Sequence, residues 1–205
     1  MNYTRLSLLQ LVRGLKDGSI DLMEYIDQAL ELLESNDRQI GAFLPETGRR
    51  ERIEQEVKTL MDRHPQCASR PPLFGVLVGV KDLYNVEGMP TRAGSKLPAS
   101  AFYGQEAALV SILRQKGAIV LGKTVSTEFA YFDPGQTRNP CNTEHSPGGS
   151  SSGSAAAVAM GYCPIALGTQ TIASIIRPSS YCGVYGFKPS WGRVSLEGVF
   201  PFSQS

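Results

Sequence analysis

The sequence predicts a layered α/β fold. Between residues 74 and 168, expected strands alternate with expected helices, which is typical of an α/β domain. The expected strands are continuous apolar runs rather than alternating ones, so we expect helices to cover both faces of the sheet. With 205 residues, the chain is long enough for one domain with a sizeable core.

Four helices are expected from apolar residues that recur every three or four positions. They are centred on residues 8–15, 22–33, 53–61 and 108–113. Ser7 is the expected N-cap of the first helix. Asp21 with Glu24 resembles a capping box at the start of the second. Pro65 should stop the third helix, and Gly117 should close the fourth.

Strands are expected at residues 74–80, 118–121, 164–167 and 184–187. We expect residues 1–66 to form a peripheral helical segment and residues 67–205 the α/β core, with residues 67–72 as the linker. The whole is expected to be one domain.

A loop rich in glycine and serine, residues 148–154, precedes an apolar run at 155–161. Because the run is apolar on all sides, we expect a buried helix with Gly161 just past its end. Its N-terminus would present free N–H groups and a positive dipole end to a cluster of hydroxyls. That arrangement suits nucleophilic chemistry or anion binding. A plain loop that turns into a helix is an equally open interpretation.

Composition argues against several classes of partner. The formal net charge is +1, which gives no electrostatic case for nucleic acid or an anionic membrane surface. The N-terminus shows no signal pattern, and the longest apolar stretch is broken by Gly161 and Pro164 before it could span a bilayer. We therefore expect a cytoplasmic protein that binds neither nucleic acid nor membrane.

The cysteines and histidines predict neither a metal nor a cofactor. No two of the four cysteines lie within a few residues of each other, so they should be reduced thiols. They are Cys67, Cys141, Cys163 and Cys182. The two histidines are His64 and His145, and we interpret His145, beside Glu144, as a loop residue rather than a ligand.

Residues 149–153 fit the G-x-S-x-G pattern of a nucleophile elbow, but that site needs a histidine after the serine. Both histidines precede the loop, so this interpretation fails within the 205 residues. The loop also lacks the Lys-Ser/Thr that ends a phosphate-binding loop. A serine nucleophile here needs another base.

Lys81 is the candidate base, because it ends the apolar run 74–80 and burial favours a neutral lysine. The alternative is a lysine that pairs with Asp82 at the end of a strand. Local sequence leaves these two interpretations equally open.

Four motifs in order resemble those of the amidase signature family of serine amidohydrolases. They are Gly79-Val80-Lys81-Asp82 and the segments 148–159, 167–178 and 181–189. The resemblance runs from about residue 5 to the C-terminus. It implies a layered α/β/α core with a mixed sheet, preceded by peripheral helices. Because catalytic domains of the family are about twice as long, it also implies that the core is incomplete.

The resemblance implies an amidohydrolase that works through a Ser–Ser–Lys triad and a serine acyl-enzyme, with no cofactor. Ser174 corresponds to the nucleophile, Ser150 to the bridging serine after a cis peptide bond, and Lys81 to the base. The oxyanion hole corresponds to the backbone N–H groups of Thr171, Ile172, Ala173 and Ser174. The implied substrate is a small-molecule amide, and self-association is left open.

Two alternatives accompany this function. One is a catalytically impaired remnant that acts as a binding partner or has no activity. The other is the amidase subunit of an amidotransferase, although that subunit usually has Lys-Asp-Asn where this chain has Lys81-Asp82-Leu83. The family also has small residues, with glycine before the nucleophile, where Ile172 and Ala173 stand. We therefore expect a distorted or obstructed oxyanion hole, with strain if Ala173 needs a positive φ.

Overall fold

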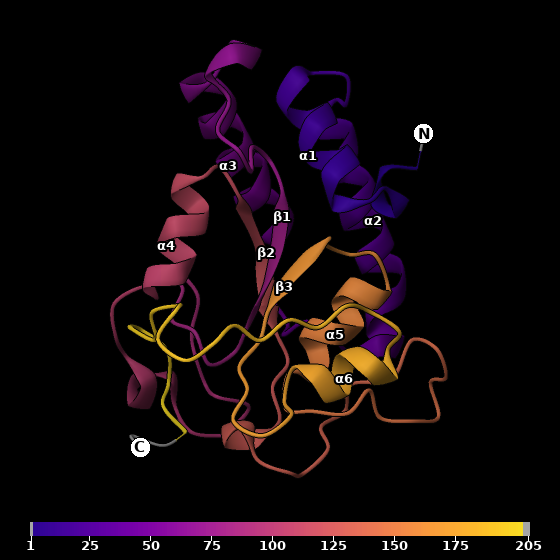
Figure 1. Cartoon of the computed structure of the whole chain (residues 1–205), viewed down its shortest axis with the longest axis vertical. Helices are drawn as coiled ribbons and strands as arrows, with labels where there is room; N and C mark the ends of the chain where they lie inside the picture. Colours follow the sequence, from indigo (N-terminus) through magenta and orange to yellow (C-terminus); the bar gives the residue numbers. More distant parts are fainter. Residues whose placement is uncertain (1, 203–205) are drawn as a thin grey trace.

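The computed structural model describes residues 2–202 and places a parallel three-stranded sheet at the centre of the molecule (Figure 1). The strands are β1 (Leu77–Lys81), β2 (Ile119–Thr124) and β3 (Ile165–Leu167), in the order β2-β1-β3. β1 begins later than expected because the chain is still turning at Gly75, whose φ is 73°. Within residues 2–202, antiparallel pairing is limited to isolated bridges such as the one between Phe43 and Thr124.

Six α-helices of the described chain surround the sheet, and four of them are the helices expected from apolar spacing. They are α1 (Leu8–Asp17), α2 (Leu22–Ile40), α3 (Arg49–Arg63), α4 (Ala108–Gln115), α5 (Ser152–Ala159) and α6 (Ile176–Tyr181). Ser7 caps α1 by accepting from the Gln10 N–H, and Asp21 caps α2 by accepting from the Glu24 N–H. The buried helix expected from the apolar run is α5, and Gly161 follows it with a positive φ of 75°.

Helices cover both faces of the sheet, as the continuous apolar strands predicted. Leu77 and Leu121 face a core shared with α1, α2, α3 and α5. Val78, Val80 and Val120 face a second core, which includes the buried side of α4. Figure 1 shows α4 on one side of the sheet and α1 and α2 on the other. The layered α/β expectation is confirmed.

The strand expected at residues 184–187 is wrong. This segment has no regular secondary structure, and within residues 2–202 it pairs with no strand. An apolar run becomes a strand only when a neighbour takes its backbone hydrogen bonds. Its large side chains instead lie in water, since Tyr185 and Phe187 are both more than 80% exposed.

Candidate active site

Lys81 is the last residue of β1, and its side chain is fully buried. Its Nζ lies 2.7 Å from Ser150 Oγ, 3.1 Å from Ser151 Oγ and 2.8 Å from Thr169 Oγ1. All three hydrogen-bond partners are neutral hydroxyls. Burial lowers the pKa of the Lys81 amine from its ordinary value to about 7. The lysine therefore changes between its neutral and charged forms near neutral pH.

The alternative in which Lys81 pairs with Asp82 does not describe this site. The carboxylate of Asp82 instead forms an ion pair with Lys123 of β2, with Nζ 3.0 Å from Oδ1. Asp82 directly follows β1 and its N–H still donates to the Thr124 carbonyl oxygen, so the alternation of side chains along the strand puts its carboxylate on the face opposite Lys81. No carboxylate therefore contacts the amine of Lys81 within residues 2–202.

The residues that lead into α5 bring two serines to Lys81. Ser150 and Ser151 are almost completely buried, and α5 begins at Ser152. The start of α5 also packs tightly against residues 42 and 125, which requires glycine at position 153, since a Cβ there would overlap the Ala42 carbonyl oxygen and the Val125 amide nitrogen. The positive end of the helix dipole thus points at the hydroxyl cluster, which disfavours a charged lysine.

The peptide bond between Gly149 and Ser150 is cis, as the resemblance implied. Two neighbours hold this segment in place. The guanidinium of Arg177 donates to the Gly149 carbonyl oxygen at 2.8 Å, and the Thr127 N–H donates to the Ser150 carbonyl oxygen at 3.1 Å. Ser150 is thus fixed through its backbone, which leaves its hydroxyl for Lys81.

Ser174 lies beside the hydroxyl cluster in the loop that precedes α6. Its carbonyl oxygen accepts from the Ser151 N–H at 3.1 Å, and the residue is only 7% exposed. The structure thus brings the backbone of Ser174 next to the two serines at Lys81. Within residues 2–202, its Oγ makes no direct hydrogen bond to another group.

Backbone donors gather just before Ser174. In the described part of the chain, no acceptor binds the N–H groups of Thr171, Ile172, Ala173 or Ser174. The next two N–H groups, of Ile175 and Ile176, both donate to the Gln170 side-chain oxygen, at 2.8 and 2.9 Å. Gln170 therefore holds the loop in a shape that keeps the four preceding donors available.

Ile172 and Ala173 do not adopt the strained conformation that the sequence suggested. Neither has a positive φ, and the Ile172 residue is 79% exposed. The conditional strain at Ala173 is therefore absent from this structure. That the exposed Ile172 side chain obstructs the oxyanion hole stays a prediction.

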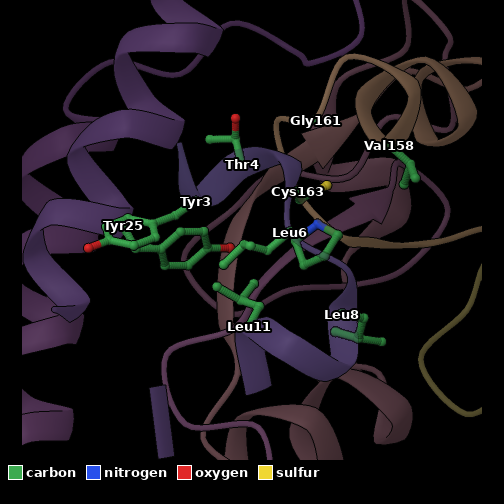
Figure 2. Close-up of a pocket in the computed structure, with 10 residues that line it drawn as sticks. Tyr3, Thr4, Leu6, Leu8, Leu11, Tyr25, Val158, Gly161 and Cys163 are labelled. Carbon is green, nitrogen blue, oxygen red and sulfur yellow. The ribbon is translucent and has the colours of Figure 1, made fainter. Parts of the chain in front are cut away.

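One cavity of the described residues lies away from this cluster. A cavity of about 170 Å³ opens between the N-terminal segment and the turn after α5, and Figure 2 shows Leu6, Leu11, Tyr25 and Cys163 around it. None of the three expected triad residues lines it. The lysine–serine cluster is instead at the carboxyl ends of the strands, where ligands of open α/β sheets commonly bind.

Several contributors to the site were not expected from sequence. Thr169 and Ser151 contact Lys81, Gln170 holds the donor loop, and Arg177 holds the cis segment. All four lie inside the motifs that carry the family resemblance, which was the available signal. Their roles depend on contacts between distant segments that no local pattern encodes.

The remaining candidate groups lie apart from this cluster. His145 is exposed in a loop, and all four cysteines are free thiols, of which Cys163 and Cys182 are buried. Among the described residues, no three acidic, histidine or cysteine side chains gather as metal ligands do. No helix within residues 2–202 has the length and hydropathy needed to cross a bilayer.

Comparison with known proteins places these residues in a family context. The profile of the family described as Amidase matches residues 24–205. AtzE, the 1-carboxybiuret hydrolase subunit of Pseudomonas sp. (strain ADP), is 38% identical over 208 residues, which cover 96% of this chain and 44% of that protein. The A subunit of glutamyl-tRNA(Gln) amidotransferase from Exiguobacterium sibiricum is 39% identical, over 93% of this chain and 40% of the relative.

Solved structures give the same picture. The peptide amidase of Stenotrophomonas maltophilia superposes with a TM-score of 0.88 at 34% identity, covering 97% of this chain and 43% of the enzyme. The chain thus spans less than half the length of the relatives that it matches.

Proposed function

Because the chain belongs to the amidase family, we propose that it carries the Ser–Ser–Lys machinery of a carboxylic amide hydrolase. One observation carries this proposal: a fully buried lysine with a pKa of about 7 is surrounded only by hydroxyls, one of them Ser150. A general base works best when its pKa lies near the operating pH, and a pKa of about 7 suits a base that operates near neutral pH. The nucleophile is Ser174, with Ser150 between it and the lysine.

The hydrogen bonds at Lys81 suit a neutral amine. A neutral amine donates two hydrogen bonds and accepts one. The Ser151 hydroxyl donates to the Thr169 carbonyl oxygen, so Ser151 Oγ accepts from Lys81. With Thr169 Oγ1 as the second acceptor, the charged amine donates its third proton to Ser150 Oγ, and the lone pair of the neutral amine can instead accept the Ser150 hydroxyl proton. Ser150 can then accept the proton of Ser174.

In the proposed reaction, Ser174 Oγ attacks the amide carbonyl as its proton passes through Ser150 to Lys81. The backbone N–H groups of residues 171–174 stabilise the oxyanion of the tetrahedral intermediate. Return of the proton to the leaving nitrogen breaks the C–N bond and gives the acyl-enzyme. The same relay then activates water, which releases the acid and frees Ser174.

Labelling with a fluorophosphonate tests this proposal without requiring full turnover. We expect the probe to modify Ser174, detected by peptide mass spectrometry. Lys81→Ala should slow labelling by about 10²-fold or more, because a general base is lost. Lys58→Ala, on an exposed position of α3, is the matched control. Labelling that is equally fast without Lys81 would contradict the lysine base.

A panel of simple amides, assayed by ammonia release, then addresses the substrate. The alternative of an amidotransferase subunit is favoured by the glutamyl-tRNA(Gln) amidotransferase relatives. Ammonia release should then depend on a partner protein and a charged tRNA. Comparable rates on simple amides without any partner would favour the hydrolase.

The donor loop gives a second test in any preparation that turns over. Replacement of Ile172 and Ala173 by Ala and Gly should raise kcat if these side chains hinder the oxyanion hole. Loss of one donor typically costs about 10²–10³-fold in rate, which bounds the gain. An unchanged or lower kcat would mean that the loop is already productive, as its ordinary φ angles suggest.

A further inference from the structure

A second buried lysine lies close to the site but takes no part in the proposed reaction. Lys123 is 4% exposed, and its Nζ contacts Asp82 Oδ1 at 3.0 Å, the Tyr84 carbonyl oxygen at 2.8 Å and Thr91 Oγ1 at 2.8 Å. An ammonium has three donors, and each has an acceptor here, one of them a carboxylate. Lys123 is thus surrounded as a cation should be.

Asp82 uses its buried carboxylate to fix the turn that follows β1. It accepts from the Arg92 N–H at 3.3 Å and from the Gly94 N–H at 3.2 Å. Between them, Ala93 has a φ of 52°, in the left-handed region that the Cβ of an alanine disfavours. The turn therefore depends on the carboxylate that holds it on both sides.

This turn leads directly to the bridging serine. The Ala93 carbonyl oxygen accepts from the Phe129 N–H at 2.8 Å, and a Cβ on Gly94 would lie 2.6 Å from the Ser126 carbonyl oxygen. The turn thus packs against the segment whose Thr127 N–H holds the Ser150 carbonyl oxygen. Asp82 therefore supports both partners of the site, since it also follows Lys81 in the chain.

We propose that Asp82 and Lys123 form a charge-compensated positioning pair: Asp82 fixes the end of β1 and the turn against Ser150, and Lys123 cancels its charge. Without Lys123, a buried anion would lie one residue from Lys81 and favour the charged form of the base. The pair itself is a structural observation. Only the benefit that we assign to it, a base kept largely neutral, rests on the proposed function.

Few other charges of the described residues surround Lys81. The Tyr84 hydroxyl and the Cys163 thiol have pKa values that burial raises to about 12, so both are neutral near pH 7. Arg177 is the other cation, and its guanidinium binds the Gly149 carbonyl oxygen. Nothing titratable is contributed by α5, whose polar residues are serines. Asp82 and Lys123 are thus the charges whose balance can be changed most selectively.

Titration of Lys81 by NMR tests the pair in the chain as it stands. Lysines labelled with ¹³C and ¹⁵N report the pKa of Lys81, which is identified by the resonance missing in Lys81→Met. Lys123→Met should raise that pKa by on the order of one unit, because Asp82 becomes an unbalanced anion. Asp82→Asn should lower it, because Lys123 becomes an unbalanced cation. The double variant should return it close to the wild-type value, and Lys58→Met should leave it unchanged.

The opposite signs separate charge balance from loosening of the structure. A loosened site would admit water and move the Lys81 pKa upward in both single variants. A rise in Asp82→Asn, or no shift in either variant, would overturn the proposal. Asp82→Asn preserves shape, so it decides the question even where Lys123→Met does not fold. Because the titration needs no turnover, its result is independent of serine labelling. The expected shifts of the Lys81 pKa without any labelling of Ser174 would refute only the proposed function.

Discussion

The two buried lysines at neighbouring strand ends differ in what surrounds their amines. Lys81 contacts three hydroxyls, whereas Lys123 contacts a carboxylate, a carbonyl oxygen and a hydroxyl. Burial lowers the pKa of both, but at Lys123 the charge of Asp82 and its hydrogen bond oppose that effect. One strand register therefore places a lysine ready to lose its proton on one face and a lysine held as a cation on the other.

The largest expected effect is on stability at the cationic lysine. Lys123→Met leaves the buried Asp82 without its counter-charge, and breaking such a pair costs about 3–5 kcal/mol. Urea unfolding at pH 7, followed by circular dichroism, measures the loss. A change below about 1 kcal/mol would show that the pair contributes no more than a surface salt bridge.

The opposite effect is expected at the base. Lys81→Met removes an amine whose protonation burial disfavours, so the free energy of unfolding at pH 7 should rise by up to about 4 kcal/mol. The same urea experiment measures it, and serine labelling should be lost at the same time. Destabilisation instead would mean that the hydrogen bonds of Lys81 outweigh its desolvation.

This effect should depend on pH in a defined direction. The Lys81 pKa is about 7 in the folded chain and 10.5 in the reference state, so the unfolded chain binds more protons between these values. The penalty that Lys81 imposes on folding is therefore full below pH 7 and disappears as pH rises to 10.5, so the wild-type free energy of unfolding increases across that window. The difference in the free energy of unfolding between Lys81→Met and the wild type should therefore shrink as pH rises across this window. A difference that stays constant from about pH 7 to pH 10 would contradict the lowered pKa.

The smallest effect compares one threonine at each lysine. Thr91→Val removes an acceptor from the cationic Lys123 and should cost about 1.5–3 kcal/mol, the usual range for a hydrogen bond to a charged group. Thr169→Val removes a partner of a lysine that is largely neutral above pH 7, and should cost about 1 kcal/mol. Unfolding at pH 8 measures both. Equal losses would mean that the two lysines carry the same charge in the folded chain.

Sequence predicted the fold where the information is local. Helix caps such as Ser7 and Asp21, and the apolar strand that buries Lys81, follow from residue type and spacing. The strand expected at 184–187 failed because strand formation depends on a neighbour, which the apolar pattern cannot report. The helix α6 was not expected either, because six residues with few apolar positions show no helical periodicity.

The site divides in a similar way. Burial of Lys81 could be predicted from its own strand, and the hydroxyl cluster from the loop before α5. That Asp82 binds Lys123 rather than Lys81 could not, because it depends on the pairing of β1 with β2. The sequence could not predict the ordinary φ of Ala173 either. A glycine at this position in the family does not show which backbone conformation an alanine adopts there.

The exposed aromatic segment after α6 has a practical consequence. Trp191 is the chain's single tryptophan and is 85% exposed there. Its fluorescence therefore reports the polarity around one exposed side chain without interference from a core signal. Any molecule that covers Trp191 should shift the emission to shorter wavelength, so binding at this part of the surface can be followed without an added label.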